Sequence, residues 1–380
     1  MARLISHSDY FVICTAALVL AISCETCAST QPPASFFIFG DSTVDAGNNN
    51  YINTIPIMKA NYTPYGESYF ERPTGRFSDG LVAVDFIAEY AGLPLIPPFL
   101  QPSAEFIHGV NFASGGAGVL PETNQGLVID LQTQIEYFED VRVSLKQKLG
   151  KAKARKLIKK AVYFISIGSN DYLGGYVLGN PQVRIDYNPE QYVAMVIGNL
   201  TEKIQLLYRK GGRRFGFLSL CSLGCIPILR DLNPNANKGG CFEDASALAQ
   251  AHNKALKIVL AKLERQLKGF KYSNYNLYDW LLHRINHPSH YGFKDGIDAC
   301  CGSGPFGGNF TCGKAPSYQL CDNPKYHVFW DSFHPSQALY EQLGQESLEW
   351  APSHCGTIQH SRTLPCKETL IIADAVVDDH

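Results

Sequence analysis

Short apolar runs alternate along this chain with longer segments that carry apolar residues at helical spacing. The short runs are rich in aromatic and β-branched residues and predict strands at 35–39, 161–167, 215–220 and 272–278. The longer segments predict helices at 130–149, 189–210 and 242–267. A last helix is expected from about 335 to 350, because Pro335 suits a first helical turn.

Strands that alternate with long helices predict a mostly parallel sheet that is covered on both faces. We therefore expect one doubly wound α/β domain over 29–355, with an irregular cysteine-rich insertion around 297–325. The tail 356–380 has no interpretation from its sequence. No internal repeat or long linker interrupts the pattern.

The first residues predict a secretion signal rather than part of the fold. Arg3 precedes an apolar stretch at 11–23, and small residues surround a cleavage site near Ala28, so the signal is expected at 1–28. The stretch is shorter than the roughly 20 residues of a membrane span, and no later segment qualifies. The mature chain is expected to have no integral membrane segment and to be secreted to the extracellular space or apoplast, with the vacuole as an alternative.

The net charge limits the kinds of binding partner that we expect. A formal net charge of −2 gives no reason to expect nucleic acid or an anionic membrane surface. The basic run 146–160 is expected to form the solvated face of one or two helices.

Nine of the 12 cysteines lie beyond the predicted signal and are disulfide candidates in an oxidising compartment. Adjacent Cys300 and Cys301 are each expected to pair with Cys312 or Cys321. The spacing fits no standard zinc pattern, so no metal site is expected. An odd total leaves at least one thiol free or intermolecular. Glycosylation sequons begin at Asn61, Asn199 and Asn309.

Polar residues follow several predicted strands, where ligands bind in such sheets. Gly40-Asp41-Ser42 ends the first strand, Gly168-Ser169-Asn170-Asp171 follows another, and a glycine-rich segment occupies 109–118. Each is also ordinary turn chemistry. The glycine-rich segment lacks the lysine of a P-loop and the full dinucleotide spacing, so a phosphate cradle is disfavoured.

Asp331 and His334 lie three residues apart, a spacing that places them on one side of a helical turn. A helix-capping role is the alternative. Beside a serine at a strand end, however, the pair supplies what nucleophilic catalysis requires. His334 would take the proton of Ser42 and return it to the leaving alcohol, and Asp331 would fix the imidazole tautomer. The backbone N–H groups of Ser42 and Gly115 and the amide of Asn170 would stabilise the oxyanion.

These segments resemble the four blocks of the GDSL esterase/lipases, within the SGNH hydrolases. The blocks are Gly40-Asp41-Ser42, the run 111–118, Gly168–Asp171 and the run 331–335, and further stretches at 45–51, 73–80 and Cys300-Cys301-Gly302 are similar to the plant branch. The resemblance covers about 35–352. It implies a flavodoxin-like α/β/α sandwich, a triad of Ser42, Asp331 and His334, and no metal or organic cofactor. It also implies oxyanion donors at Asn170 and at Gly115 or Gly116, of which we expect Gly115.

Two positions depart from the family pattern. Thr43 stands where the family has leucine, and the segment 219–222 replaces a proline-rich turn, which leaves Cys221 without an expected partner. The function that follows is hydrolysis of a small-molecule or lipid ester through an acyl-enzyme on Ser42. The alternatives are an acyltransferase of plant specialised metabolism with the same triad, and a catalytically idle binding protein. The sequence does not specify acyl length, alcohol or oligomeric state.

Overall fold

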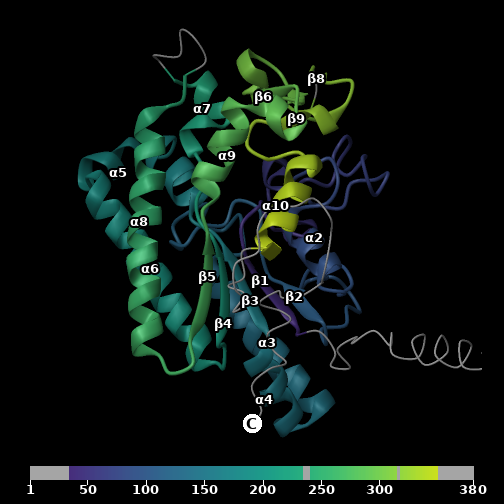
Figure 1. The fold of residues 1–380 in the computed structure, drawn as a ribbon, viewed down its shortest axis with the longest axis vertical. Coiled ribbons are helices and arrows are strands. Elements are labelled where there is room, and N and C mark those ends of the chain that lie inside the picture. The colour runs from purple at the N-terminus through teal and green to yellow at the C-terminus, as the bar shows by residue number, and fades with distance from the viewer. Residues whose placement is uncertain (1–33, 234–239, 315–316, 350–380) are drawn as a thin grey trace, which may run out of the picture. The chain divides into compact units, whose positions relative to one another are not determined.

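The computed structural model describes residues 34–233, 240–314 and 317–349 (Figure 1). The expected signal and tail lie outside the described residues, as do Cys355 and Cys366.

Its centre is a five-stranded sheet with the order β2-β1-β3-β4-β5, in which every pair of neighbours is parallel. The strands are β1 (Phe36–Gly40), β2 (Gly109–Asn111), β3 (Val162–Ser166), β4 (Arg214–Leu218) and β5 (Lys271–Tyr275). This is the flavodoxin-like order of doubly wound folds. The predicted fold class is therefore confirmed.

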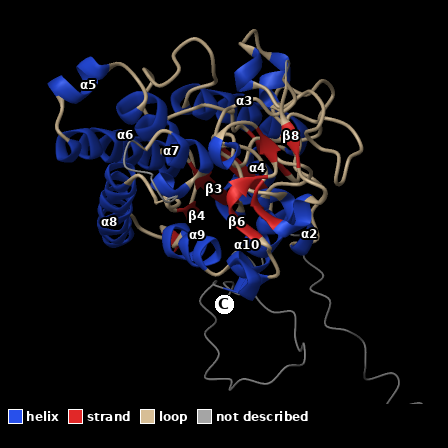
Figure 2. Cartoon of the chain, turned by 90° about the horizontal axis from the view of Figure 1, so that it is seen from above, coloured by secondary structure: helices blue, strands red, loops and turns tan. Residues whose placement is uncertain are grey.

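Helices cover both faces of the sheet (Figure 2). They are α2 (Ala83–Tyr90), α3 (Leu131–Leu149), α4 (Lys151–Lys160), α5 (Pro181–Asp186), α6 (Pro189–Arg209), α7 (Pro227–Asp231), α8 (Glu243–Gln266), α9 (Leu277–Asn286) and α10 (Gln337–Glu349). Short helical turns are η1 (Asn48–Tyr51), η2 (Pro56–Met58), the π-helix η3 (Asp171–Val177), η4 (Leu223–Cys225), η5 (Pro288–Tyr291), η6 (Pro305–Gly307) and η7 (Pro324–Tyr326).

The side-chain alternation of the strands divides the core in two. Phe37 and Phe39 of β1 pack in the cluster that receives α3, α6 and α8. Phe36 and Ile38 point the other way, into the cluster that receives α2 and α10. Successive residues of a strand face opposite sides of its sheet, so an uninterrupted apolar strand is what a two-faced core requires.

The predicted strands and helices are present, with two changed boundaries, and several further elements, among them α2, α9 and β2, were not predicted. The last helix begins at Gln337, after Ser336, whose Oγ accepts the N–H of Leu339. The aromatic run predicted as a strand to 278 ends earlier, because the Asn276 side chain caps α9. The three-residue strand β2 lies inside the glycine-rich segment and was not predicted.

The cysteine-rich insertion forms two small sheets. β6 (Asp295–Ala299) pairs with β9 (His327–Phe329) in parallel, and β7 (Cys301–Gly302) pairs with β8 (Gln319–Leu320) antiparallel. The disulfides Cys300–Cys321 and Cys301–Cys312 close the insertion. Each adjacent cysteine therefore pairs with one of its two expected partners.

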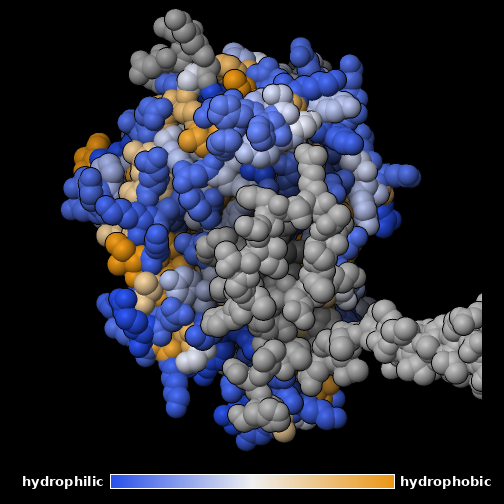
Figure 3. Space-filling view, viewed as in Figure 1, coloured by the Kyte–Doolittle hydropathy of each residue, from blue (hydrophilic) through white to orange (hydrophobic). Residues whose placement is uncertain are grey.

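Where Figure 3 colours the surface by hydropathy, it is mainly hydrophilic, with separate apolar patches. Among the described residues, no helix has the length and apolar character needed to cross a membrane.

Candidate active site

Three segments of the candidate site follow three neighbouring strands. Ser42 follows β1, the glycine-rich loop follows β2, and Asn170 follows β3. Because β1 lies between β2 and β3 and all three are parallel, their carboxyl ends lie along one edge of the sheet. The chain topology thus brings together segments that are far apart in sequence.

A tight turn presents Ser42 at the end of β1. Gly40 has no room for a side chain, since a Cβ there would lie 2.3 Å from the Ser166 carbonyl oxygen. The Gln134 side chain, from α3, bonds both the N–H and the carbonyl of Gly40 at 2.9 Å. The N–H of Val44 then closes a turn on the carbonyl of Asp41 at 3.2 Å. Only glycine fits this approach of strand and turn.

Ser42, His334 and Asp331 form a continuous hydrogen-bonded chain. Ser42 Oγ lies 2.8 Å from His334 Nε2, and His334 Nδ1 lies 2.8 and 2.9 Å from the two carboxylate oxygens of Asp331. Ser42 is 9% exposed and Asp331 is fully buried. A base within hydrogen-bond distance of a serine, itself oriented by a carboxylate, is the arrangement that activates a serine nucleophile.

Asp331 and His334 meet on a turn, not on a helix. Oδ1 of Asp331 accepts the backbone N–H groups of Phe333 and His334, both at 2.8 Å, and α10 begins only at Gln337. The pair therefore does not lie on a helical turn as predicted, although the predicted contact between the carboxylate and the imidazole is present. The capping alternative describes the same carboxylate, which caps its own turn while it binds the imidazole.

Burial acts on Asp331 to raise the pKa of its carboxyl. His334, the Tyr65 hydroxyl and the backbone donors oppose this effect, and the pKa lies below its ordinary value. Tyr65 donates to Oδ2 at 2.7 Å. Asp331 is therefore ionised at neutral pH, as a carboxylate that orients an imidazolium must be.

The expected oxyanion donors differ in availability. Within the described residues, the backbone N–H groups of Ser42 and Gly116 make no hydrogen bond. Asn170 donates one amide hydrogen to the Ala117 carbonyl at 3.0 Å, which leaves its second hydrogen for another acceptor. The N–H of Gly115, however, donates to Asp45 Oδ2 at 2.9 Å and is already used.

Asp45 organises the glycine-rich loop, a role that sequence reasoning missed. Besides Gly115, its carboxylate accepts the N–H groups of Gly47 and Asn48 at 2.7 and 2.8 Å. Asn49 Nδ2 adds a bond to the carbonyl of Gly115 at 2.8 Å. The run 45–51 is one of the stretches that are similar to the plant branch. Its hydrogen bonds to the glycine-rich loop give that run a structural function.

Thr43, the departure from the family pattern, also contacts the site. Its hydroxyl donates to Asp41 Oδ1 at 2.7 Å and lies 3.0 Å from Ser166 Oγ. Burial is the main influence on Asp41 and raises the pKa of its carboxyl to about 6, against the donors of Thr43 and the charge of His334. The residue after Ser42 therefore stabilises a second carboxylate near the imidazole.

Asp171 joins the loops after β2 and β3. It accepts the N–H groups of Val119 and Leu120 at 2.8 and 3.0 Å and the hydroxyl of Thr123 at 2.7 Å. It also begins the π-helix η3 directly after Asn170. π-Helical turns occur frequently at functional sites. The geometry fixes Asn170 relative to the glycine-rich loop.

The three predicted sequons differ in exposure. Asn61 and Asn309 are exposed, whereas Asn199 is half-buried in α6 and donates to the Met195 carbonyl at 3.0 Å. Cys225 pairs with Cys241, and Cys221 has no disulfide partner in the part of the chain that the structure describes.

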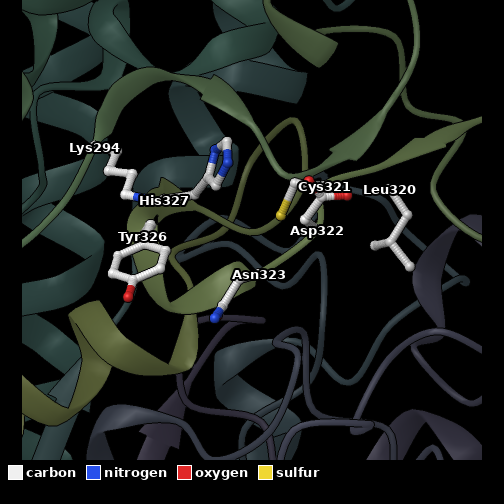
Figure 4. Close-up of a pocket in the computed structure, with 7 residues that line it drawn as sticks. All are labelled: Lys294, Leu320, Cys321, Asp322, Asn323, Tyr326 and His327. Carbon is white, nitrogen blue, oxygen red and sulfur yellow. The ribbon is translucent and has the colours of Figure 1, made fainter.

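No group of three or more His, Cys, Asp or Glu side chains suited to a metal ion occurs among the described residues. A surface pocket of about 460 Å³ lies beside the cysteine-rich insertion (Figure 4). Its lining residues are Lys294, Leu320, Cys321, Asp322, Asn323, Tyr326 and His327. None belongs to the triad, so this pocket is separate from the candidate site.

The chain was compared with known proteins. The family model described as GDSL-like Lipase/Acylhydrolase matches residues 36–347. GDSL esterase/lipase 5 of Arabidopsis thaliana is 48% identical over 360 residues, which cover 93% of this chain and 92% of that protein. A GDSL lipase of Tanacetum cinerariifolium is 48% identical over 328 residues, with 86% and 87% covered. GDSL esterase/lipase 4 of Arabidopsis thaliana is 44% identical over 351 residues, with 89% and 92% covered.

The family match spans the sheet, the insertion and the candidate triad. The resemblance drawn from four sequence blocks is confirmed, and the chain belongs to the GDSL-like lipase/acylhydrolase family.

Proposed function

We propose that this protein hydrolyses carboxylic esters through an acyl-enzyme on Ser42. The observation that carries the proposal is the buried chain Ser42–His334–Asp331, with contacts of 2.8 Å at both imidazole nitrogens. His334 takes the Ser42 proton as the oxygen attacks the ester carbon, then returns it to the leaving alcohol. Water, deprotonated by the same imidazole, releases the acid and restores the serine.

The proposed oxyanion hole consists of the Ser42 N–H, the Asn170 amide and the Gly116 N–H. Gly116 replaces Gly115 because the Gly115 N–H is held by Asp45. Gly116 has φ +86°, a backbone conformation that favours glycine. Backbone donors fixed in this way need no reorganisation as the oxyanion forms.

An active-site phosphonate probe tests the nucleophile. We expect the probe to label the purified protein, and Ser42→Ala to abolish both labelling and esterase activity. Labelling that survives in Ser42→Ala would show that another residue is the nucleophile. Product analysis with an ester and added alcohols then tests the outcome of deacylation. We expect free acid, and transfer of the acyl group to an added alcohol would favour the acyltransferase alternative.

We also propose that the chain is secreted after removal of 1–28 and glycosylated at Asn61 and Asn309. The three disulfides among the described residues suit an oxidising compartment. The amide of Asn199 is bonded within α6, which makes this sequon the poorest acceptor of the three. Mass spectrometry of the secreted protein with and without glycosidase tests each sequon. Occupancy at Asn199 with neither Asn61 nor Asn309 modified would contradict the assignment.

A further inference from the structure

The carboxylate of Asp331 accepts hydrogen bonds from two sets of donors. The first set belongs to its own turn, 331–334. The second is the hydroxyl of Tyr65, which lies outside this turn. The turn also contacts other parts of the chain, because the Ser332 carbonyl accepts the N–H of Ile228 at 3.0 Å and His334 contacts Ser42. Among the described residues, however, Tyr65 is the only one outside the turn that donates to the carboxylate itself.

Tyr65 is itself rigidly placed. Its side chain is fully buried, and its ring lies 6.0 Å from Trp330, 6.3 Å from Phe77 and 5.3 Å from Tyr62, each edge to face. Phe77 in turn lies 4.8 Å from the His334 ring. One aromatic cluster therefore contacts both the carboxylate and the imidazole. Interlocked aromatic rings have few alternative rotamers, so the hydroxyl position is well defined.

The cysteine-rich insertion closes this cluster. Cys300, Cys301 and Cys312 are buried in the same apolar cluster as Tyr65 and Trp330. The two disulfides thus connect the insertion to the aromatic cluster that contacts the triad. Within this cluster, Tyr65 is the residue that bonds Asp331.

We propose that Tyr65 is a positioning residue for the Ser42–His334–Asp331 triad, acting through its hydrogen bond to Asp331 Oδ2. The inference rests on the proposed ester hydrolysis. With Oδ2 bound by Tyr65 and Oδ1 bound by backbone N–H groups, the carboxylate plane cannot rotate, and both oxygens stay within 2.9 Å of His334 Nδ1. The hydroxyl remains a donor at all working pH values, because burial and Asp331 hold the pKa of Tyr65 well above its ordinary range.

The test compares Tyr65→Phe with a matched control. Tyr163→Phe removes the hydroxyl of another fully buried tyrosine, which donates to the Ile158 carbonyl at 3.0 Å in the main core. kcat and KM are measured with 4-nitrophenyl butyrate and expressed per site labelled by the phosphonate probe. We expect Tyr65→Phe to lower kcat about tenfold with KM changed less than about twofold, since a donor to a charged group is lost. Tyr163→Phe should lower thermal stability and leave kcat per labelled site unchanged.

The pH profile separates positioning from packing. Without the Tyr65 donor, the Asp331 carboxylate attracts the imidazolium form of His334 more strongly, so the acid limb of kcat should move to higher pH in Tyr65→Phe and stay fixed in Tyr163→Phe. Other titratable groups that act on Asp331 are His334, Lys314, Tyr62 and Tyr340. They are common to all variants, so the difference between profiles reports on Tyr65.

The outcomes are distinguishable. If Ser42→Ala is still labelled, the proposed function fails. If Ser42→Ala is unlabelled while Tyr65→Phe keeps the wild-type kcat and acid limb, the positioning role is overturned. If Tyr65→Phe does not fold, 3-fluorotyrosine at position 65 keeps the shape and alters only the donor strength. A change in kcat with that residue is expected, and an unchanged kcat and acid limb would overturn the proposal.

Discussion

The backbone N–H of Gly115 donates to the carboxylate of Asp45 at 2.9 Å, in the interior of the protein. This bond makes Gly115 a support of the glycine-rich loop, and it leaves Gly116 as the second-block donor in the proposed oxyanion hole. The distinction depends on a contact between residues 70 positions apart in the chain.

Replacing Asn170 should affect the transition state more than substrate binding. We expect Asn170→Ala to lower kcat about 100-fold with little change in KM, because loss of one oxyanion donor typically has this effect. Steady-state kinetics per labelled site measure it. Asn188→Ala is the control, since Asn188 caps α6 and should affect stability alone. An equal fall of kcat in both variants would contradict the role of Asn170.

Asp45→Ala should weaken both stability and catalysis. The substitution removes the acceptor of three backbone N–H groups, those of Gly47, Asn48 and Gly115. Such buried donors left without a partner cost about 1–3 kcal/mol each. We expect a lower denaturation midpoint and a lower kcat per labelled site. An Asp45→Ala protein with the wild-type kcat would show that the loop needs no such anchor.

The contact between Thr43 and the buried carboxyl of Asp41 predicts that the stability of the protein depends on pH. Because burial raises the pKa of Asp41 from its ordinary 3.8 to about 6, the folded state holds this proton more tightly than the unfolded state. The stability that Asp41 contributes is thus complete below about pH 4 and is lost as pH rises through about 6.

Thr43→Val removes a donor to the ionised carboxylate and should make this loss steeper, whereas Thr43→Ser retains the hydroxyl. Urea denaturation between pH 4 and 8 measures it. The Val–Ser difference in unfolding free energy should grow with pH, and a constant difference would contradict the contact with Asp41.

Removing a disulfide of the insertion should reduce activity as well as stability. Cys301→Ser with Cys312→Ser opens a link across 11 residues, and removal of a disulfide typically costs about 2–4 kcal/mol. The substitutions also change two side chains that pack in the buried cluster of Tyr65 and Trp330, so kcat per labelled site should fall.

The control opens Cys225–Cys241, which spans 16 residues and lies outside that cluster. It should lose comparable stability and keep its kcat per labelled site. Equal kinetic loss in both double variants would show that the insertion has no special role.

The sequence predicted the sheet, its main helices and the triad because these depend on local patterns or on short motifs. The sequence did not predict features that depend on contacts between residues far apart in the chain. β2 is three residues long and too short to show alternation. The hydrogen bond of Tyr65 to Asp331 joins residues 266 positions apart, and no local pattern marks Tyr65. The choice between Gly115 and Gly116 likewise depends on Asp45, far upstream.

The order of the site segments along the chain has a consequence for the synthesis of the protein. Ser42 and the loops of its proposed oxyanion hole follow β1, β2 and β3, whereas Asp331 and His334 follow β9, near the end of the described chain. A nascent chain therefore carries Ser42 through the synthesis of the next 292 residues before it has the imidazole that would activate it. Until residue 334 has left the ribosome and the insertion has folded, the growing polypeptide lacks the base on which its proposed ester chemistry depends.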